Sequence, residues 1–161
     1  MAMKKINLII CVLFFIGIGI GKGQYIDLLN VPGVGYGARP DGNLIPLGNT
    51  FYGMASEDIG GHGIIFSLKK DGSNYKDLFD FGGLSGRDPA GSLTLSGDTL
   101  YGMTFESGLG GEGTLFSYNI STSSLDVMLN FNGSGSDIYG AYPEGDITLS
   151  VTGDTLYGTR Y

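Results

Sequence analysis

Short runs in which every second residue is hydrophobic recur along most of this chain, and Gly-rich polar segments separate them. In the middle of the chain this pattern predicts four strands, at about 92–96, 99–104, 113–119 and 124–131. A period of two places one side of each strand against a core, and Gly-rich punctuation is typical of turns between strands. We therefore expect an all-β protein after the N-terminal segment.

Turn residues support these strand limits. Gly97 and Asp98 form a tight-turn pair between the first two strands. The doublet at 110–111 precedes the third strand, where glycine takes positive φ values without steric cost. A polar Ser/Thr segment at 121–124 leads into the fourth strand. The four strands are thus expected to follow one another as an antiparallel meander.

The fourth strand carries apolar residues on both sides. Val127, Leu129 and Phe131 alternate and are predicted to share one face. Met128 adds an apolar group to the opposite face. Both faces of the sheet are therefore expected to be partly covered by neighbouring structure.

The same order of motifs occurs three times. The Tyr-Gly pairs that begin at Tyr52, Tyr101 and Tyr157 are separated by 49 and 56 residues. A Gly-Gly-x-Gly-x-x-Phe motif follows at 60–66 and 110–116, and Pro-x-Gly occurs at 89–91 and 143–145. We place the units at about 43–91, 92–145 and 146–161, after a trailing strand of a preceding unit within 25–42.

Four strands in about 50 residues, repeated, indicate blades of a β-propeller, because stacked sheets cover faces that a lone sheet leaves open. A β-solenoid is the alternative, although its rungs are usually shorter, and a sandwich does not explain the repeat. We expect a partial propeller of four-stranded antiparallel blades, about two full blades plus flanking strands. Ten strands do not close a ring, so the sequence predicts a fragment of a longer protein or an oligomer that closes the ring. The strand near Tyr25–Asn30 would complete the last blade.

The N-terminal residues 1–23 have the layout of a secretory signal peptide, which is expected to form a short helix. Lys4 and Lys5 precede the thirteen uncharged residues Leu8–Ile20, which are too few for a membrane span of about 20. Gly21 and Gly23 supply small residues before a cleavage site at Gln24. The sequence therefore predicts an extracellular or cell-surface protein with no membrane span after cleavage. Residues 24–161 form the repeat region.

Composition and charge narrow the possible partners. The chain has 161 residues, with 30 Gly, 10 Tyr and 9 Phe, and the aromatic residues argue for a packed core rather than disorder. Beyond the leader, six basic residues face sixteen acidic ones, a formal net charge of −10. Such a surface repels nucleic acid and anionic membranes. Cys11, the only cysteine, lies inside the leader, so the mature chain has no disulfide and no Cys-bound metal.

Candidate catalytic and metal-binding residues do not form a recognisable set. His62 is the only histidine and is expected to be a solvated loop residue, since no nucleophile-elbow motif accompanies it. No calcium-loop motif is present, although loop carboxylates such as Glu57-Asp58 and Glu106 leave weak calcium binding open. The repeated tyrosines are expected in the core or between blades rather than as sugar platforms. We therefore assign no catalytic residue, metal ligand or cofactor, and leave the ligand-binding residues unassigned.

The combination LYGMT…GGEGTLFSY…LNF…YPEG, with its FYGMAS and TLYGTR copies, resembles the Gloeo/Verruco (GloVer) tandem repeat of choice-of-anchor repeat proteins. The resemblance covers nearly all of residues 25–161. It implies a secreted or surface-attached bacterial protein whose anchor lies at the far C-terminus. It brings no catalytic residues, and this sequence shows no C-terminal anchor, which leaves its mode of attachment open.

Two functional hypotheses follow. The first is a non-catalytic extracellular scaffold whose loops bind a glycan or a surface protein, because the segments Ser56–Gly60, Phe105–Gly110 and Asn132–Tyr142 vary between units over a repeated frame. The alternative is a propeller-type enzyme, a glycan hydrolase or lyase, whose active residues lie outside this sequence. A purely structural role in a surface layer is a third option.

Overall fold

The computed structural model describes residues 38–57, 60–133 and 140–159, which are built almost wholly from strands. The elements, in chain order, are β1 (Ala38–Leu47), β2 (Thr50–Glu57), β3 (Ile64–Lys69), β4 (Lys76–Asp80), the 3-10 turn η1 (Gly83–Ser85), β5 (Arg87–Ser96), β6 (Thr99–Glu106), β7 (Thr114–Asn119), β8 (Ser124–Asn130), β9 (Ile147–Leu149) and β10 (Leu156–Gly158). The predicted all-β class is confirmed over these residues.

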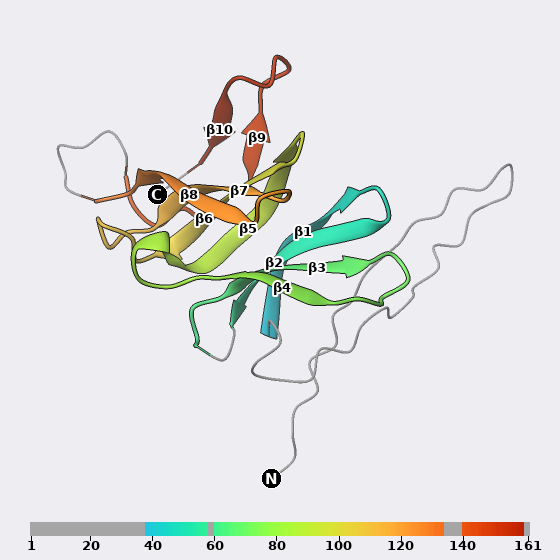
Figure 1. Cartoon of the computed structure of the whole chain (residues 1–161). Coiled ribbons are helices and arrows are strands. Elements are labelled where there is room, and N and C mark those ends of the chain that lie inside the picture. The colour runs from blue at the N-terminus through green and yellow to red at the C-terminus, as the bar shows by residue number, and fades with distance from the viewer. Residues whose placement is uncertain (1–37, 58–59, 134–139, 160–161) are drawn as a thin grey trace, which may run out of the picture.

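The strands form two four-stranded antiparallel sheets and one hairpin (Figure 1). The first sheet has the order β1-β2-β3-β4, and the second sheet has the order β5-β6-β7-β8. The hairpin joins β9 to β10. Each four-stranded sheet is a simple meander, as the repeat predicts, and the hairpin corresponds to the first two strands of a third unit.

Equivalent tight turns connect the first two strands of each sheet. Gly48 and Gly97 both have a φ of +57°, and each begins a two-residue connection that closes on Thr50 or Thr99. A positive φ at the first central position suits a hairpin turn of type II′, which glycine adopts without strain. The predicted Gly97-Asp98 turn is confirmed.

The first strand of each sheet is longer than the sequence pattern predicts. β5 begins at Arg87 rather than near residue 92, and it includes Pro89 and Gly91. Its register with β6 shifts between Ala90 and Thr94. Proline and glycine weaken regular strands but are accommodated at bulges. The prediction ended the strand too early because it treated Pro-x-Gly as a break, and for the same reason it left residues 38–42 of β1 outside the first unit.

A second register shift, between β7 and the edge strand β8, changes which residues of β8 share a face. The register of β7 with β8 shifts between Leu115 and Phe116. Leu129 and Phe131 share a face as predicted, whereas Leu125 packs against the core on the other side of the sheet. Met128 itself is 52% exposed, but both faces of the sheet are partly covered by neighbouring structure, as expected.

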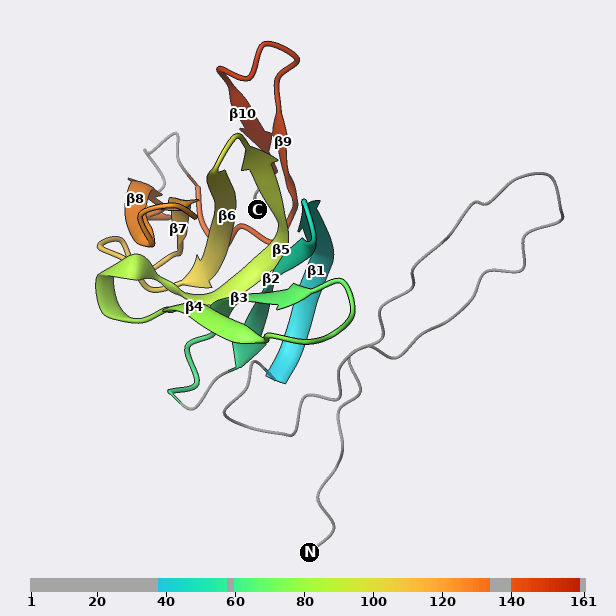
Figure 2. The same cartoon turned by 45° about the vertical axis from the view of Figure 1, so that its right-hand side comes forward.

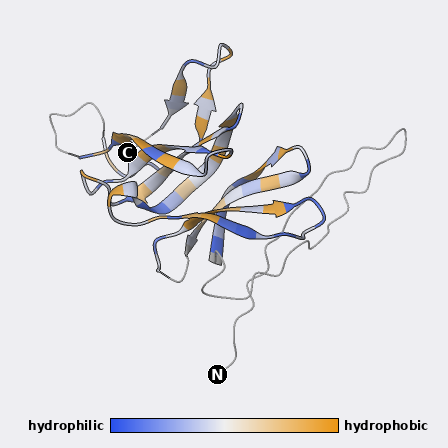
Figure 3. Cartoon of the chain, viewed as in Figure 1, coloured by the Kyte–Doolittle hydropathy of each residue, from blue (hydrophilic) through white to orange (hydrophobic). Residues whose placement is uncertain are grey.

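Apolar side chains fill the space between the two sheets, which lie side by side in both views (Figure 2). Hydrophobic residues are interspersed with polar ones along the strands of both sheets (Figure 3). The buried residues of this intersheet core are Tyr52, Met54, Ile65 and Phe81 on one side and Leu93, Leu100, Phe116 and Tyr118 on the other. Phe116 and Leu100 are fully buried. Neighbouring sheets thus cover one another's apolar faces, as the repeat predicts.

The next interface repeats this packing with equivalent residues. Met103 and Phe131 of the second unit form a core with Ile147 of the hairpin. These residues stand at the unit positions of Met54, Phe81 and Leu93. The hairpin therefore meets the second sheet as the second sheet meets the first.

Candidate functional site

A polar contact between neighbouring units fixes how their first strands lie beside one another. The backbone N–H of Asn43 donates to Ser92 Oγ at 2.9 Å, and the N–H of Ser92 donates to Asp146 Oδ1 at 2.6 Å. These three residues directly follow glycine 42, 91 or 145 in their own units. The first strands of successive units are therefore joined at equivalent positions, directly after this glycine.

The glycines of this motif allow the close approach. Gly42 and Gly91 both have a φ of +71°, where a side chain is strained. A Cβ on Gly91 would lie 2.5 Å from the carbonyl oxygen of Gly145, and a Cβ on Gly42 would meet the carbonyl of Gly91. Backbone thus packs against backbone from one unit to the next.

The residue before the proline of each Pro-x-Gly motif is also unusual. Arg39, Asp88 and Tyr142 have φ values of +59°, +52° and +48° and occupy the same place in three units. Non-glycine residues seldom adopt this conformation, which costs about 1–3 kcal/mol and persists only where surrounding structure imposes it. Each unit therefore holds one side chain in a fixed direction at the same end of its first strand.

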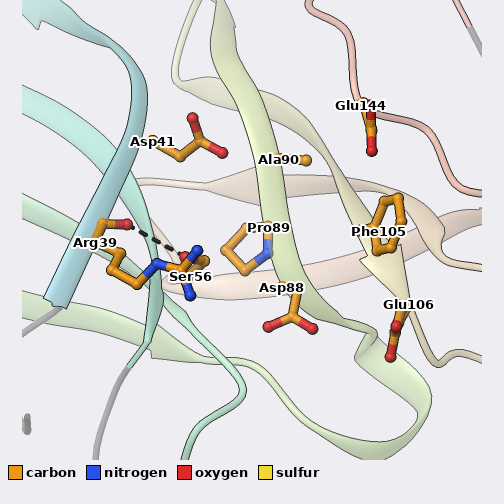
Figure 4. Close-up of a pocket in the computed structure, with 9 residues that line it drawn as sticks. All are labelled: Arg39, Asp41, Ser56, Asp88, Pro89, Ala90, Phe105, Glu106 and Glu144. Atoms are coloured by element: carbon orange, nitrogen blue, oxygen red, sulfur yellow. Dashed lines mark hydrogen bonds between the residues drawn. The ribbon is translucent and has the colours of Figure 1, made fainter.

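A cavity of about 470 Å³, which we call the loop-end pocket, lies at this end of the sheets around β5 (Figure 4). Its lining comes from repeated positions of successive units: Arg39, Asp41, Ser56, Asp88, Pro89, Ala90, Phe105, Glu106 and Glu144. The volume falls within the range of about 300–1,000 Å³ that is usual for small-molecule sites. Asp41, Ala90 and Glu144 are the variable middle residues of Pro-x-Gly, so each unit supplies its own side chain to one cavity.

The pocket is acidic. It has four carboxylates and one guanidinium in its lining. Arg87, beside the pocket, donates from Nε to Glu106 Oε2 at 2.8 Å and lies 3.7 Å from Asp88 Oδ2. Burial raises the pKa of Asp88, and the attraction of Arg87 only partly opposes that rise. Such a lining accepts hydrogen bonds from ligand hydroxyls and attracts ligand cations.

The variable loops converge on this pocket. Ser56 and Phe105 begin two of these loops and line the pocket. Tyr142 ends the third, and its ring lies 5.0 Å from that of Phe105, centroid to centroid. The N–H of Tyr142 donates to the carbonyl of Glu112 at 3.0 Å. A hydrogen bond with the Glu112 carboxylate also raises the pKa of the Tyr142 phenol. The structure therefore gathers the described parts of all three loops at one end.

His62 lies in the loop before β3, where the sequence placed it. It is partly buried, and its carbonyl oxygen accepts a hydrogen bond from the N–H of Asp88 at 2.9 Å. This contact ties one unit's loop to the start of the next unit's first strand. Within residues 38–57, 60–133 and 140–159, no group of three or more His, Cys, Asp or Glu side chains is arranged to hold a metal ion.

The repeated tyrosines have different environments. Tyr52 is buried in the intersheet core, and Tyr101 packs against the core beneath the hairpin. Tyr157 is 61% exposed. The prediction of a packing role is confirmed for the first two and wrong for the third.

Sequence reasoning did not single out Arg39, Asp88 or Glu144. Their common signal is position, because each lies at a fixed offset from the Pro-x-Gly motif. The predicted leader at 1–23, Cys11 and the strand near Tyr25–Asn30 lie outside the described residues. In the part of the chain that the structure describes, no helix has both the length and the apolar character needed to cross a membrane.

Comparison with known proteins agrees with the repeated architecture. The sequence profile of the Gloeobacter/Verrucomicrobia repeat matches residues 16–161, which is most of the chain. No curated protein and no solved structure matches it. The motifs that the profile covers are those that build the two sheets and the hairpin. The chain belongs to the Gloeobacter/Verrucomicrobia repeat family.

Proposed function

We propose that this chain is a secreted or cell-surface scaffold without catalytic activity, and that its loop-end pocket binds an extracellular glycan or a protein surface. The observation that carries the proposal is the convergence of repeated, variable positions on one cavity. Asp41, Ala90 and Glu144 occupy one motif position in three units, yet all line the same pocket. Binding functions are commonly placed on variable segments over a rigid frame.

The frame proposed for this scaffold is a β-propeller. Two meander sheets and a hairpin stack with equivalent residues at both interfaces. Their first strands lie side by side and are joined at equivalent positions, as the strands of blades around a common axis are. We propose that further units, in the same polypeptide or in other copies, continue this stacking.

A glycan array probed with the secreted chain tests the binding role. We expect retention of intact glycans, and we expect substitution of Glu144→Gln to weaken retention about tenfold, as loss of a charge-assisted hydrogen bond does. Asp126→Asn is the matched control, because Asp126 is an exposed carboxylate on β8 that does not line the loop-end pocket. Cleaved glycans would instead support a hydrolase or lyase. Equal loss in both variants would contradict a site at the loop-end pocket.

The extracellular location has its own test. Expression of the full chain in a bacterium and N-terminal sequencing of the secreted product should give a protein that begins at Gln24. Retention of residues 1–23 on a cytoplasmic product would contradict secretion without affecting the binding result.

A further inference from the structure

A second cavity lies between the two sheets at the opposite end of β2 from the loop-end pocket. We call it the basic cleft, and its volume is about 240 Å³. The side chains that matter for its chemistry are those of Thr50, Tyr52, Ser67, Lys69, Lys76 and Tyr118. The apolar residues Leu68, Leu78 and Ile120 complete the lining, so these polar groups lie beside an apolar wall.

Hydrogen-bonding groups line this cleft from both sheets. The ammonium of Lys69 donates to Thr50 Oγ1 at 3.3 Å, which holds the charge against the wall. The Tyr118 hydroxyl donates to the carbonyl of Leu78 at 3.4 Å. Burial is the main cause that raises the pKa of the Tyr52 phenol, so this hydroxyl stays protonated and able to donate.

Lys69 and Lys76 differ in type from the residues at the equivalent positions of the second sheet. Thr50 pairs with Lys69 across β2 and β3, whereas the second sheet pairs Thr99 with Asn119 at this place.

The same substitution pattern occurs one strand further out. Ser67 pairs with Lys76 across β3 and β4, whereas the second sheet pairs Ser117 with Asp126. Both sheets therefore have threonine and serine at the two inner positions, but only the first sheet has lysine opposite them. The fold therefore does not require lysine at either position, and the cations call for another explanation.

Charge is concentrated at this cleft. Five basic residues fall within the described ranges, and three of them, Lys69, Lys70 and Lys76, lie within eight residues around the β3–β4 connection. The neighbouring carboxylates already have partners. Asp71 accepts hydrogen bonds from the N–H and hydroxyl of Ser73, at 3.0 and 2.7 Å.

Asp98 accepts a hydrogen bond from Ser121 Oγ at 2.9 Å. Burial raises the pKa of the Tyr75 phenol, and so does the hydrogen bond that this phenol forms with Asp77, next to Lys76. The ammonium groups of Lys69 and Lys76 are therefore the charges that a ligand in the cleft would meet.

We propose that the basic cleft binds a small hydroxylated carboxylic acid, of the size of a single uronic acid residue. An ammonium and a carboxylate form strong charge-assisted hydrogen bonds, and the hydroxyls of Thr50, Ser67 and Tyr118 suit the hydroxyl groups of such a ligand. The volume lies below the range of about 300–1,000 Å³ of drug-sized sites, which limits the bound group to one sugar ring. The proposal is independent of the loop-end pocket.

Isothermal titration of the full secreted chain at low ionic strength tests this site, with galacturonate, galactose and inorganic sulfate as the probes. Galacturonate is expected to bind at least tenfold more tightly than galactose, which lacks the carboxylate, and than sulfate, which lacks the ring. Lys69→Gln and Lys76→Gln should each weaken galacturonate binding about tenfold. Lys70→Gln is the matched control, because its ammonium lies 5.6 Å above the Phe51 ring, away from the cleft lining.

Four results would overturn the proposal. Equal affinity for galactose and galacturonate would show that the ammonium groups are not used. Equal affinity for sulfate would show that charge alone is recognised. An equal effect of Lys70→Gln, or no binding of galacturonate, would show that this cleft is not its site. Urea unfolding of each variant checks that the substitution leaves the fold intact.

Discussion

Replacement of Gly91 by alanine tests whether backbone contact between units is a major source of stability. Gly91 has a φ of +71°, and a Cβ there would lie 2.5 Å from the carbonyl oxygen of Gly145. The left-handed conformation costs a non-glycine residue about 1–2 kcal/mol. Overpacking against a neighbouring unit adds about 1–3 kcal/mol. We therefore expect Gly91→Ala to lower the free energy of unfolding by about 2–5 kcal/mol.

Gly97→Ala separates these two contributions. Gly97 has a φ of +57°, and a Cβ there would meet no atom within 4 Å. Gly97→Ala should therefore lower the free energy of unfolding only by the cost of the left-handed conformation, about 1–2 kcal/mol. Urea unfolding followed by circular dichroism measures both, and with a slope of about 1–3 kcal/mol/M the two midpoints should differ by about 1 M. Equal midpoints would refute the argument that the units approach through Gly91.

Three further substitutions test polar contacts by urea unfolding. Thr104→Val should lower the free energy of unfolding by about 1–3 kcal/mol, because the fully buried Thr104 Oγ1 accepts a hydrogen bond from the N–H of Thr114 at 3.0 Å. An unchanged urea midpoint would show that the Thr114 N–H finds another acceptor. Asp88→Asn should stabilise the protein at pH 7, because burial raises the folded pKa of this carboxyl and so disfavours its charged form. That gain should vanish near pH 2, where the carboxyl is protonated in both states, and a gain at both pH values would refute the electrostatic cause. Asp154→Asn should instead destabilise the protein at pH 7, since hydrogen bonds from Thr152 and other hydroxyls lower the pKa of the Asp154 carboxyl. The stabilising effect of the Asp154 carboxylate is present at pH 7 and is lost as the pH falls through its folded pKa. An Asp154→Asn midpoint that stays below wild type by the same amount at pH 2 would contradict it.

The strands and turns of the fold follow from local physical chemistry, and the sequence predicts them well. Alternation with period two and the Gly97-Asp98 turn locate β5 and β6, since both signals lie within a few residues. The bulges do not follow in this way. In the sequence, Pro89 and Gly91 resemble the end of a strand, and only the contact with the next unit makes them part of one.

The candidate sites were harder to predict than the fold. The three variable loops lie at the end of the sheets that holds the loop-end pocket, and Ser56 and Phe105 line it. No local motif marks Arg39 or Glu144 as a pocket residue, because both line the loop-end pocket only as a result of how separate units stack. Lys69 and Lys76 become notable only when strand pairing shows which residues replace them in the second sheet.

The glycine-to-carbonyl approach between first strands has a consequence for how such proteins diverge. The spacing of neighbouring sheets is set by main-chain atoms of Gly42, Gly91 and Gly145, so it does not depend on which side chains the outer segments carry. The second interval is seven residues longer than the first, yet Ile147 still meets the second sheet as Leu93 meets the first. Insertions in the loops that precede these glycines can therefore accumulate without changing how the sheets pack, which leaves recognition free to evolve in each unit separately.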